Sequence, residues 1–292
     1  MIRTVNEGFR EFLSRLTPTE TERTAGKNHR ASVRAALEAN LPVIRMFESG
    51  SFSHGTGVRG YSDIDAFVSL RGGRPSLSFD ALTRVANVLA ARFPFTRVAI
   101  QRPAVVVGFG GGYETWEIIP AFITGLGAPG QLVYEIPGHG VGSGWILSAP
   151  ELHLAYVNRC NEVPSHGKAK ALARLIKAWK YFNAVPVSSF YLEMRCAQLV
   201  ASVRSYSHIV DVWYVLRMMQ IDSLAAMADP TGLTGYFYAC STEAEAREAL
   251  SKLDSAVGRA ANALDARSAS NDERAFYYLS ILFGGRFPAR IY

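Results

Sequence analysis

The spacing of apolar residues changes twice along this chain of 292 residues, and only a fold with a sheet between two helical regions satisfies all three parts. Residues 3–14 and 18–39 have apolar side chains at helical spacing. Between residues 43 and 122, short β-branched or aromatic segments alternate with Gly and Pro, as in a sheet, and one helical pattern interrupts them at 79–93. From Pro150 onward the pattern is helical again.

These patterns predict an α/β (α+β) fold with two lobes. The predicted strands cover residues 43–51, 64–70, 96–100, 104–109 and 115–122. The predicted helices of the second half lie near residues 150–160, 166–183, 188–205, 208–227, 242–266 and 271–284. We therefore expect a core of residues 1–149, in which both N-terminal helices pack behind a mixed sheet, and a helical lobe of residues 150–292.

The composition is that of an ordinary globular protein, with 49% apolar and 19% charged residues, which excludes disordered and coiled-coil classes. The longest apolar runs are far shorter than the roughly 18 residues that a membrane helix needs, so neither a membrane partner nor a signal peptide is expected and the chain is predicted to be cytoplasmic. The spacing of Cys160, Cys196 and Cys240 matches neither a zinc site nor a disulfide framework.

The net charge of +6 favours polyanionic partners, and nucleotides are the simplest of them. Lys and Arg number 31 against 25 Asp and Glu, but they form no dense run. Stable binding of nucleic acid is therefore not expected, because a protein that grips RNA usually carries an extended basic track with aromatic side chains.

Asp63 and Asp65 lie two residues apart where a predicted strand begins. Because side chains alternate along a strand, both carboxylates project from the same face. Two such carboxylates repel each other unless a cation lies between them, and hard divalent cations prefer carboxylate oxygens. For an Asp-x-Asp pair alone, a capped turn is the alternative interpretation.

A third carboxylate is available on a neighbouring predicted strand, TWEIIPAF, in which Glu117 lies on the face opposite to its two neighbours. Two metal ions about 3.5–4 Å apart can clamp the attacking and leaving oxygens of a phosphoryl displacement. Asp63, Asp65 and Glu117 are therefore predicted to be the catalytic metal ligands, with Mg²⁺ as the metal and Mn²⁺ as the alternative.

Gly50 and Ser51 follow an apolar strand and open a glycine-rich stretch. Backbone N–H groups in such a stretch can form a concave nest for a nucleoside triphosphate, and the Ser51 hydroxyl would be a further donor. The alternative interpretation is an ordinary turn that binds no ligand. The string 55–60 matches the pattern G-x-G-x-x-G, but it leads into a strand instead of a helix, so dinucleotide binding is not predicted.

Together, Gly50–Ser51, the string SDID and the later WEIIPAF resemble the DNA polymerase β-like nucleotidyltransferase superfamily. The closer resemblance is to the bacterial cyclic-oligonucleotide synthases related to cyclic GMP-AMP synthase, often called CD-NTases. It extends over about two thirds of the chain, including the opening FREFLSRLTPTETE, the phrase ESGSFSHGTGVRGYSDIDAFVSL and the segment LARLIKAWKYFNAVPVSSFYLE.

The resemblance implies roles for single residues. Asp63 and Asp65 match the first two metal carboxylates of the family, and Glu117 falls at the third, where the family usually has Asp. Lys177 matches a lysine that reaches the triphosphate of the donor nucleotide, and Ser189 a serine that contacts phosphate.

The residue after Ser189, Phe190, matches an aromatic that stacks on a base. If the resemblance is set aside, Lys177 could instead belong to a solvated basic helix face, and Phe190 could instead be a core residue.

The resemblance also implies an activity: template-independent synthesis of a cyclic di- or trinucleotide second messenger from nucleoside triphosphates, in antiphage signalling. The expected partners are the nucleoside triphosphates, a separate effector protein that binds the product, and an accessory regulatory protein. Two other functions stay open. One is a linear nucleotidyltransferase that acts on RNA, protein or a small-molecule hydroxyl, and the other is a nucleotide-binding protein without catalysis.

Overall fold

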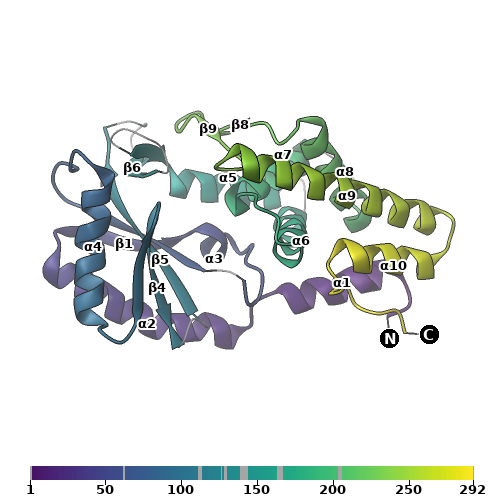
Figure 1. Cartoon of the computed structure of the whole chain (residues 1–292), viewed down its shortest axis with the longest axis horizontal. Coiled ribbons are helices and arrows are strands. Elements are labelled where there is room, and N and C mark those ends of the chain that lie inside the picture. The colour runs from purple at the N-terminus through teal and green to yellow at the C-terminus, as the bar shows by residue number, and fades with distance from the viewer. Residues whose placement is uncertain are drawn as a thin grey trace.

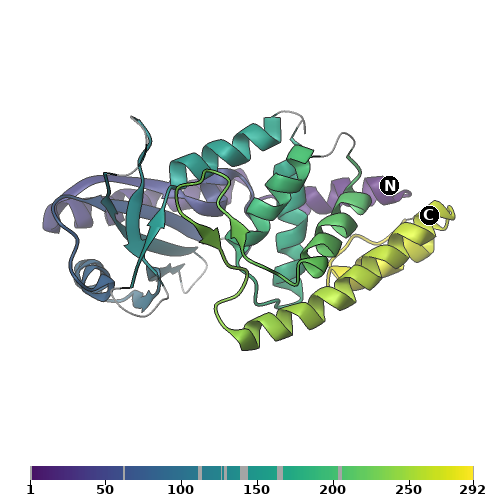
Figure 2. The same ribbon diagram turned by 90° about the horizontal axis from the view of Figure 1, so that it is seen from above.

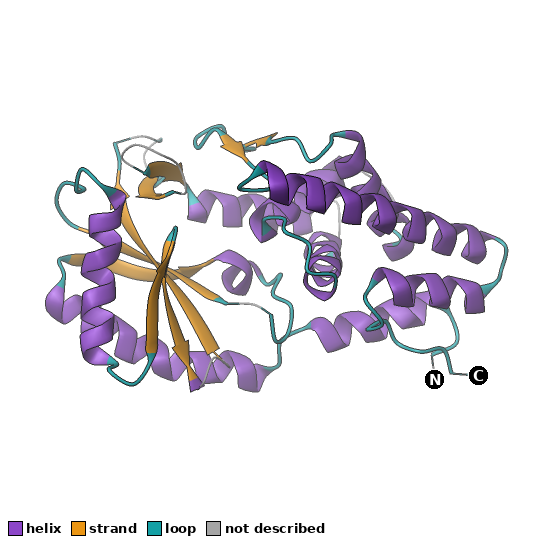
Figure 3. Ribbon diagram, in the orientation of Figure 1, coloured by secondary structure: helices purple, strands orange, loops and turns teal. Residues whose placement is uncertain are grey.

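A mixed sheet occupies one half of the protein and a group of helices the other (Figures 1 and 3). The computed structural model describes residues 2–61, 63–110, 114–125, 127, 130–138, 144–162, 167–202 and 206–291, with the backbone alone for 20–28. Figure 2 shows the two halves side by side, with the two chain ends close together at the end of the helical half that is far from the sheet. At these ends the backbone N–H of Ile291 donates to the carbonyl of Ile2.

The sheet contains seven strands within the described residues, in the order β1-β2-β5-β4-β3, with β6 paired to β5 and β7 to β6. Their bounds are β1 (Val43–Ser49), β2 (Ile64–Leu70), β3 (Arg97–Gln101), β4 (Ala104–Phe109), β5 (Glu114–Ile123), β6 (Tyr134–Pro137) and β7 (Trp145–Ser148). The pair β2 and β5 is parallel and the other pairs are antiparallel, so the predicted mixed sheet is confirmed.

The first half of the chain also contains α1 (Val5–Leu16), α2 (Glu20–Asn40), the short α3 (Gly50–His54) and α4 (Ser78–Arg92). Side chains of α2 and α4 pack on one face of the sheet, where Val33, Leu37 and Leu82 contact the inward residues of the strands. The opposite face carries the smaller cluster around Phe67 and Tyr134 and is turned toward the helical half. The functional side chains described below lie on this second face.

The prediction that both N-terminal helices pack behind the sheet is wrong for α1. Its capping box at Thr4 starts the helix, and the rings of Phe9 and Phe12 then pack on aromatic residues near the C-terminus. Phe12 lies 4.8 Å from Phe283 and Phe9 lies 5.1 Å from Phe287, measured between ring centroids. Such aromatic pairs contribute about 0.5–1.5 kcal/mol each beyond area burial, so α1 is bound to the helical half.

The helical half contains α5 (Pro150–Glu162), α6 (Lys168–Phe182), α7 (Ser189–Ser202), α8 (His208–Ile221), α9 (Glu243–Ser268) and α10 (Asp272–Leu282), together with the strand pair β8 (Met227–Ala228) and β9 (Tyr236–Phe237). All six predicted helices are present, but the prediction of helix over residues 222–227 is wrong, because α8 ends at Ile221 and β8 begins at Met227. The predicted residues 166 and 203–205 lie outside the described residues. The division of the chain at residue 150 stays a prediction, and α5 begins there.

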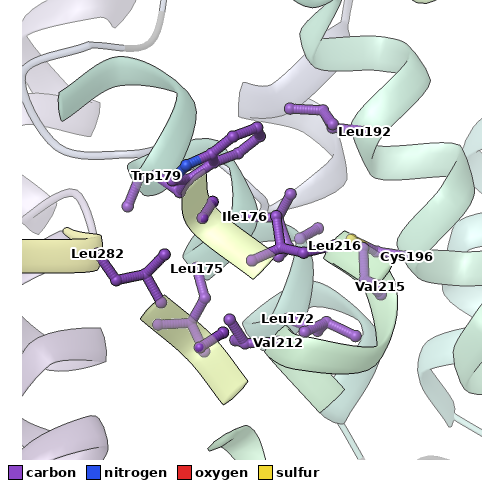
Figure 4. Close-up of a cluster of buried hydrophobic side chains, with 14 of the residues drawn as sticks. Leu172, Leu175, Ile176, Trp179, Leu192, Cys196, Val212, Val215, Leu216 and Leu282 are labelled. Atoms are coloured by element: carbon purple, nitrogen blue, oxygen red, sulfur yellow. The ribbon is translucent and has the colours of Figure 1, made fainter. Parts of the chain in front are cut away.

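Helix α6 contributes to the cluster of buried hydrophobic side chains drawn in Figure 4. Leu172, Leu175, Ile176 and Trp179 are buried, as the helical spacing of the sequence predicts. Each buried side chain of this size stabilises the fold by about 1.5–3 kcal/mol relative to an exposed one. This burial fixes the direction in which the remaining side chains of α6 point, including its lysines.

Several short elements were not predicted. Strands β6 and β7 lie in and after a stretch that the density of Gly and Pro marks as a loop, and β8 and β9 have two residues each. Segments this short are too brief to show a period, so only their pairing partners reveal them. No helix within the described residues has the length and apolar character needed to cross a membrane.

Candidate active site

A cavity of about 560 Å³ lies between the sheet and the helical half. Its lining comes from β1, α3, β2, β5, β6 and β7 in the sheet and from α5, α6, α7 and β9 in the helical half. All the site residues predicted from the sequence line it, namely Gly50, Ser51, Asp63, Asp65, Glu117, Lys177, Ser189 and Phe190. The fold therefore brings together residues that lie as far apart as positions 50 and 190.

The carboxylates of Asp65 and Glu117 are placed by the parallel pairing of β2 and β5. The two residues are direct partners in the register, and Ile64 pairs with Trp116 in the same way. Ile64 and Trp116 are buried in the core beneath α2 and α4, so alternation turns Asp65 and Glu117 to the cavity face. The expectation that these two carboxylates share a face of adjacent strands is confirmed.

Glu114 points to the opposite face, as its position three residues before Glu117 predicts. Its carboxylate accepts hydrogen bonds from Nε1 of Trp116 at 2.6 Å and pairs with Nδ1 of His29 at 2.8 Å. It thus belongs to the packing between α2 and the sheet and takes no part in the cavity.

The three cavity carboxylates hold protons more tightly than ordinary carboxyl groups. Burial raises the pKa of Asp65 well above its usual value, and the charges of Glu117 and Asp63 raise it further. Burial and the charge of Asp63 likewise raise the pKa of Glu117. Burial also raises the pKa of Asp63, although Thr115 donates a hydrogen bond to it. A cation bound next to these carboxylates would stabilise their ionised form by neutralising the charge.

The donor set fits a hard divalent cation, because three carboxylates face one cavity and oxygen ligands are what Mg²⁺ and Mn²⁺ prefer. Asp65 and Glu117 are hydrogen-bonded to each other, so one of them holds a proton that a cation would displace. In this arrangement no three His, Cys, Asp or Glu side chains of the described residues form a group that could hold a metal ion. A cation held by the three carboxylates would therefore require a rearrangement of these side chains in which the shared proton is lost.

Gly50 makes the close approach of Asp65 to α3 feasible. A Cβ atom at position 50 would lie 1.8 Å from Oδ2 of Asp65, and the residue has a φ of +60°, which side-chain-bearing residues rarely adopt. Only glycine therefore fits between the end of β1 and the Asp65 carboxylate. The next residue, Ser51, lines the cavity from the first turn of α3.

Two lysines of α6 reach the cavity in different ways. Lys177 is fully buried, and its Nζ donates to Oγ1 of Thr56 at 3.1 Å and pairs with Glu193 at 3.4 Å. Lys180, one turn further on, donates from Nζ to Oγ of Ser189 at 2.6 Å. Burial and the neighbouring charge of Lys177 lower the pKa of Lys180 to about 8, against the opposing effect of Asp63 and Glu117.

Lys180 was not singled out as a site residue from the sequence, although it follows Lys177 at helical spacing in LIKAWK. Ser189 accepts the hydrogen bond of Lys180 and lies 3.1 Å from the hydroxyl of Tyr181. The structure thus groups Ser189 with Lys180, while Lys177 is held by Glu193.

Glu193 is the centre of a buried polar network below the cavity. It accepts hydrogen bonds from Thr56 and His54 and forms the ion pair with Lys177. Burial alone would raise its pKa, but Lys177 and His54 outweigh burial and lower the pKa to about 2. Glu193 is therefore ionised at neutral pH and joins α7 to α3 and α6.

Aromatic side chains form the wall of the cavity near α5. The ring of Phe190 lies 4.8 Å from Phe237 and 5.3 Å from His153, both at steep angles, so an edge of each ring meets a face of another. Phe237 lies on β9, in a hairpin held by Asp229, whose carboxylate accepts hydrogen bonds from Thr231 and Thr234. The sequence did not reveal Phe237, because nothing near it has a recognisable pattern.

Comparisons with known proteins identify the family of this chain. A model of the Second Messenger Oligonucleotide or Dinucleotide Synthetase domain matches residues 3–161. No curated protein matches the chain in sequence.

Several solved structures have the same fold. The structure of CdnC from Escherichia coli MS115-1 with ATP has a TM-score of 0.76 and 18% identity, and the match covers 97% of this chain and 99% of that one. The same CdnC in complex with HORMA-deltaN has a TM-score of 0.74 and 18% identity, with 97% and 98% covered. The cyclic AMP-GMP synthase DncV of Vibrio cholerae, with a linear intermediate, has a TM-score of 0.74 and 12% identity, with 99% and 98% covered.

At these identities the solved structures support the fold, whereas the domain model extends over more than half of the chain and supports the family. The resemblance to CD-NTases drawn from the sequence motifs is confirmed. The protein therefore belongs to the family of second messenger oligonucleotide or dinucleotide synthetases.

Proposed function

We propose that the cavity joins two or three nucleoside triphosphates through Asp63, Asp65 and Glu117 and then closes the product into a ring. In each step a ribose hydroxyl attacks an α-phosphate and pyrophosphate leaves. The observation that supports this most is the convergence of three carboxylates of raised pKa opposite Lys180 and Ser189 in one cavity.

Asp63, Asp65 and Glu117 would hold the divalent metal, for which we propose Mg²⁺ or Mn²⁺. When bound, the metal would lower the pKa of the attacking hydroxyl and neutralise phosphate charge. The residues of the chain supply the positioning: Gly50 allows Asp65 to approach α3, and the pairing of β2 with β5 fixes Glu117 beside it. No separate protein base is needed for this mechanism.

For the triphosphate we propose Lys180 and Ser189 as the side chains that hold its phosphates, with the backbone at Gly50 and Ser51 on the other side. Lys177, which also lines the cavity, is a second proposed phosphate ligand, although its Nζ is paired with Glu193. Phe190 is proposed to stack on a base, and Phe237 supports its ring from the side. Aromatic stacking accepts any base, so these rings by themselves select none.

Replacement of Lys180 by Met is expected to raise the KM for nucleoside triphosphate about 10- to 100-fold, because hydrogen bonds to charged groups contribute about 1.5–3 kcal/mol. Steady-state kinetics at pH 7 measures this. In the unaltered enzyme, KM should also rise as the pH increases through about 8, where Lys180 loses its proton. A matched control is Lys170→Met, on the same helix but outside the cavity lining. An equal effect of both substitutions would refute the role of Lys180.

The product decides between the proposed functions. The protein is incubated with labelled ATP, GTP, CTP and UTP and with Mg²⁺ or Mn²⁺, and the mixture is then treated with phosphatase. We expect a labelled product that survives phosphatase, because a ring has no terminal phosphate. Label on added RNA would instead support a linear transferase, and absence of turnover would support a nucleotide-binding protein without catalysis.

We further propose that the product acts on a separate effector protein in antiphage signalling in the cytoplasm, where nucleoside triphosphates are abundant. An accessory regulator is proposed as well, because CdnC, which has the same fold, has been seen in complex with HORMA-deltaN. Co-expression with such a protein, followed by size-exclusion chromatography, tests the second proposal.

A further inference from the structure

A second cavity, of about 330 Å³, lies in the helical half and shares no lining residue with the active cavity. Helices α1, α6, α8 and α9 each contribute to it, and Figure 1 shows α1 beneath the helical lobe at the side away from the sheet. Arg10 comes from α1, Lys168 from the first residue of α6, and Arg267 from the last turn of α9. Three elements that are distant in the sequence therefore point cations at one space.

The lining of this cavity is positively charged, and the carboxylates that interact with its cations, Glu7 with Arg10 and Asp211 with Lys168, lie outside it. Among the described residues it contains no Asp or Glu. Arg10 and Lys168 make no hydrogen bond or ion pair with any described residue, and Arg267 donates only to Oγ of Ser207, at 3.0 Å. Cations that converge without a carboxylate repel each other, and the protein gains when an anion neutralises them.

Neutral polar groups complete the cavity. His208 lines it, and burial together with the charges of Lys168 and Arg10 lowers the pKa of His208 to about 4, so it is neutral at pH 7. Asp211 lies near Lys168 but outside the lining, and burial raises its pKa to about 6. Ser207 and His208 line the cavity at the start of α8, so the positive end of this helix dipole also lies at the cavity.

We propose that this cavity is a binding site for a small phosphate-bearing anion, separate from the substrate site. Two arginines and one lysine provide the donors that phosphate oxygens prefer, and the start of a 14-residue helix adds oriented N–H groups. The volume admits one or two phosphate groups and excludes a protein segment.

Occupancy of this site would affect the active cavity through α6. Lys168 begins α6 at the second cavity, and Lys180 lies on the same helix about 18 Å further along, at the active cavity. A bound anion would also fix α1 to α6, since Arg10 and Lys168 would share it. The site thus has the position of an effector site for the synthase.

Calorimetric titration with inorganic pyrophosphate tests the proposal. The full chain is used in about 150 mM salt with a chelator, because the proposed binding of phosphate groups at the active cavity depends on a divalent cation. We expect a single binding event. Arg10→Ala and Lys168→Ala should each weaken it at least about tenfold. Neither side chain makes a hydrogen bond or ion pair with a described residue, so these variants should keep the fold.

Two controls separate this cavity from the alternatives. Lys180→Met, in the active cavity, and Arg84→Ala, an exposed cation on α4, should leave the affinity for pyrophosphate unchanged. Pyrophosphate should also slow amide hydrogen exchange in α1 and the first turn of α6, in the unaltered protein and not in Arg10→Ala. The proposal is wrong if pyrophosphate fails to bind, or if Lys180→Met weakens binding while Arg10→Ala does not.

Discussion

Asp65→Asn is expected to lower the rate of oligonucleotide synthesis at least about 10²-fold while the fold is kept. Loss of one preorganised electrostatic contact typically has this effect, and Asp65 contacts both Gly50 and Glu117 in the cavity. Stability should not fall. Because the folded-state pKa of Asp65 is raised, its ionisation opposes folding as the pH rises through that pKa, and an uncharged Asn removes the opposition.

Turnover and thermal unfolding, each with and without Mg²⁺, measure the two effects of Asp65→Asn. The metal should raise the unfolding temperature of the unaltered protein, and this rise should be smaller in the variant. Glu117→Asp is the matched variant, since it keeps a carboxylate and shortens the side chain by one methylene. A near-normal rate in Asp65→Asn would contradict the metal assignment, whereas turnover in Glu117→Asp would show that the longer side chain is not required.

The second prediction with a large expected effect concerns the free energy of unfolding. Glu193→Gln should lower the free energy of unfolding by about 3–5 kcal/mol at pH 7, because Lys177 is then a buried charge without a counter-charge. In the unaltered protein, the pKa of Glu193 is lowered to about 2, so its contribution is complete above the ordinary glutamate value and is lost as the pH falls toward 2. Urea unfolding at pH 7 and at pH 4 measures both.

Two companion variants interpret the Glu193→Gln result. Adding Lys177→Met to Glu193→Gln should recover much of the lost stability, because the unpaired charge is removed. Glu248→Gln breaks an exposed pair with Lys252 that is shorter, 2.7 Å against 3.4 Å, and should cost less than about 1 kcal/mol. If both Glu variants had the same small effect, the buried network would not hold α7 to α3 and α6.

The sequence predicted those features that depend on local periodicity. The alternation of strand residues alone placed Asp65 and Glu117 on one face, and the pairing of β2 with β5 then made them neighbours. The apolar spacing of α6 likewise predicted which of its apolar residues are buried. In both cases the deciding physical cause, the two-residue or 3.6-residue period, acts within a single segment.

Features that depend on distant partners were not accessible from the sequence. The packing of α1 on the helical half depends on aromatic residues near position 285, and the turn of Lys180 into the cavity depends on Ser189. Phe237 reaches the cavity because the hydrogen bonds of Asp229 shape its hairpin. No pattern within α1, α6 or β9 contains this information, since it resides in the contact between segments.

Because β2 and β5 pair in parallel, the candidate site can form only after the chain between these two strands has folded. Parallel neighbours need a crossover, and here α4, β3 and β4 lie between Leu70 and Glu114 along the chain. During synthesis on the ribosome, both aspartates emerge well before the glutamate that must sit beside them. A chain that ends within the crossover lacks Glu117, so under the proposed metal assignment such a fragment is expected to make no product.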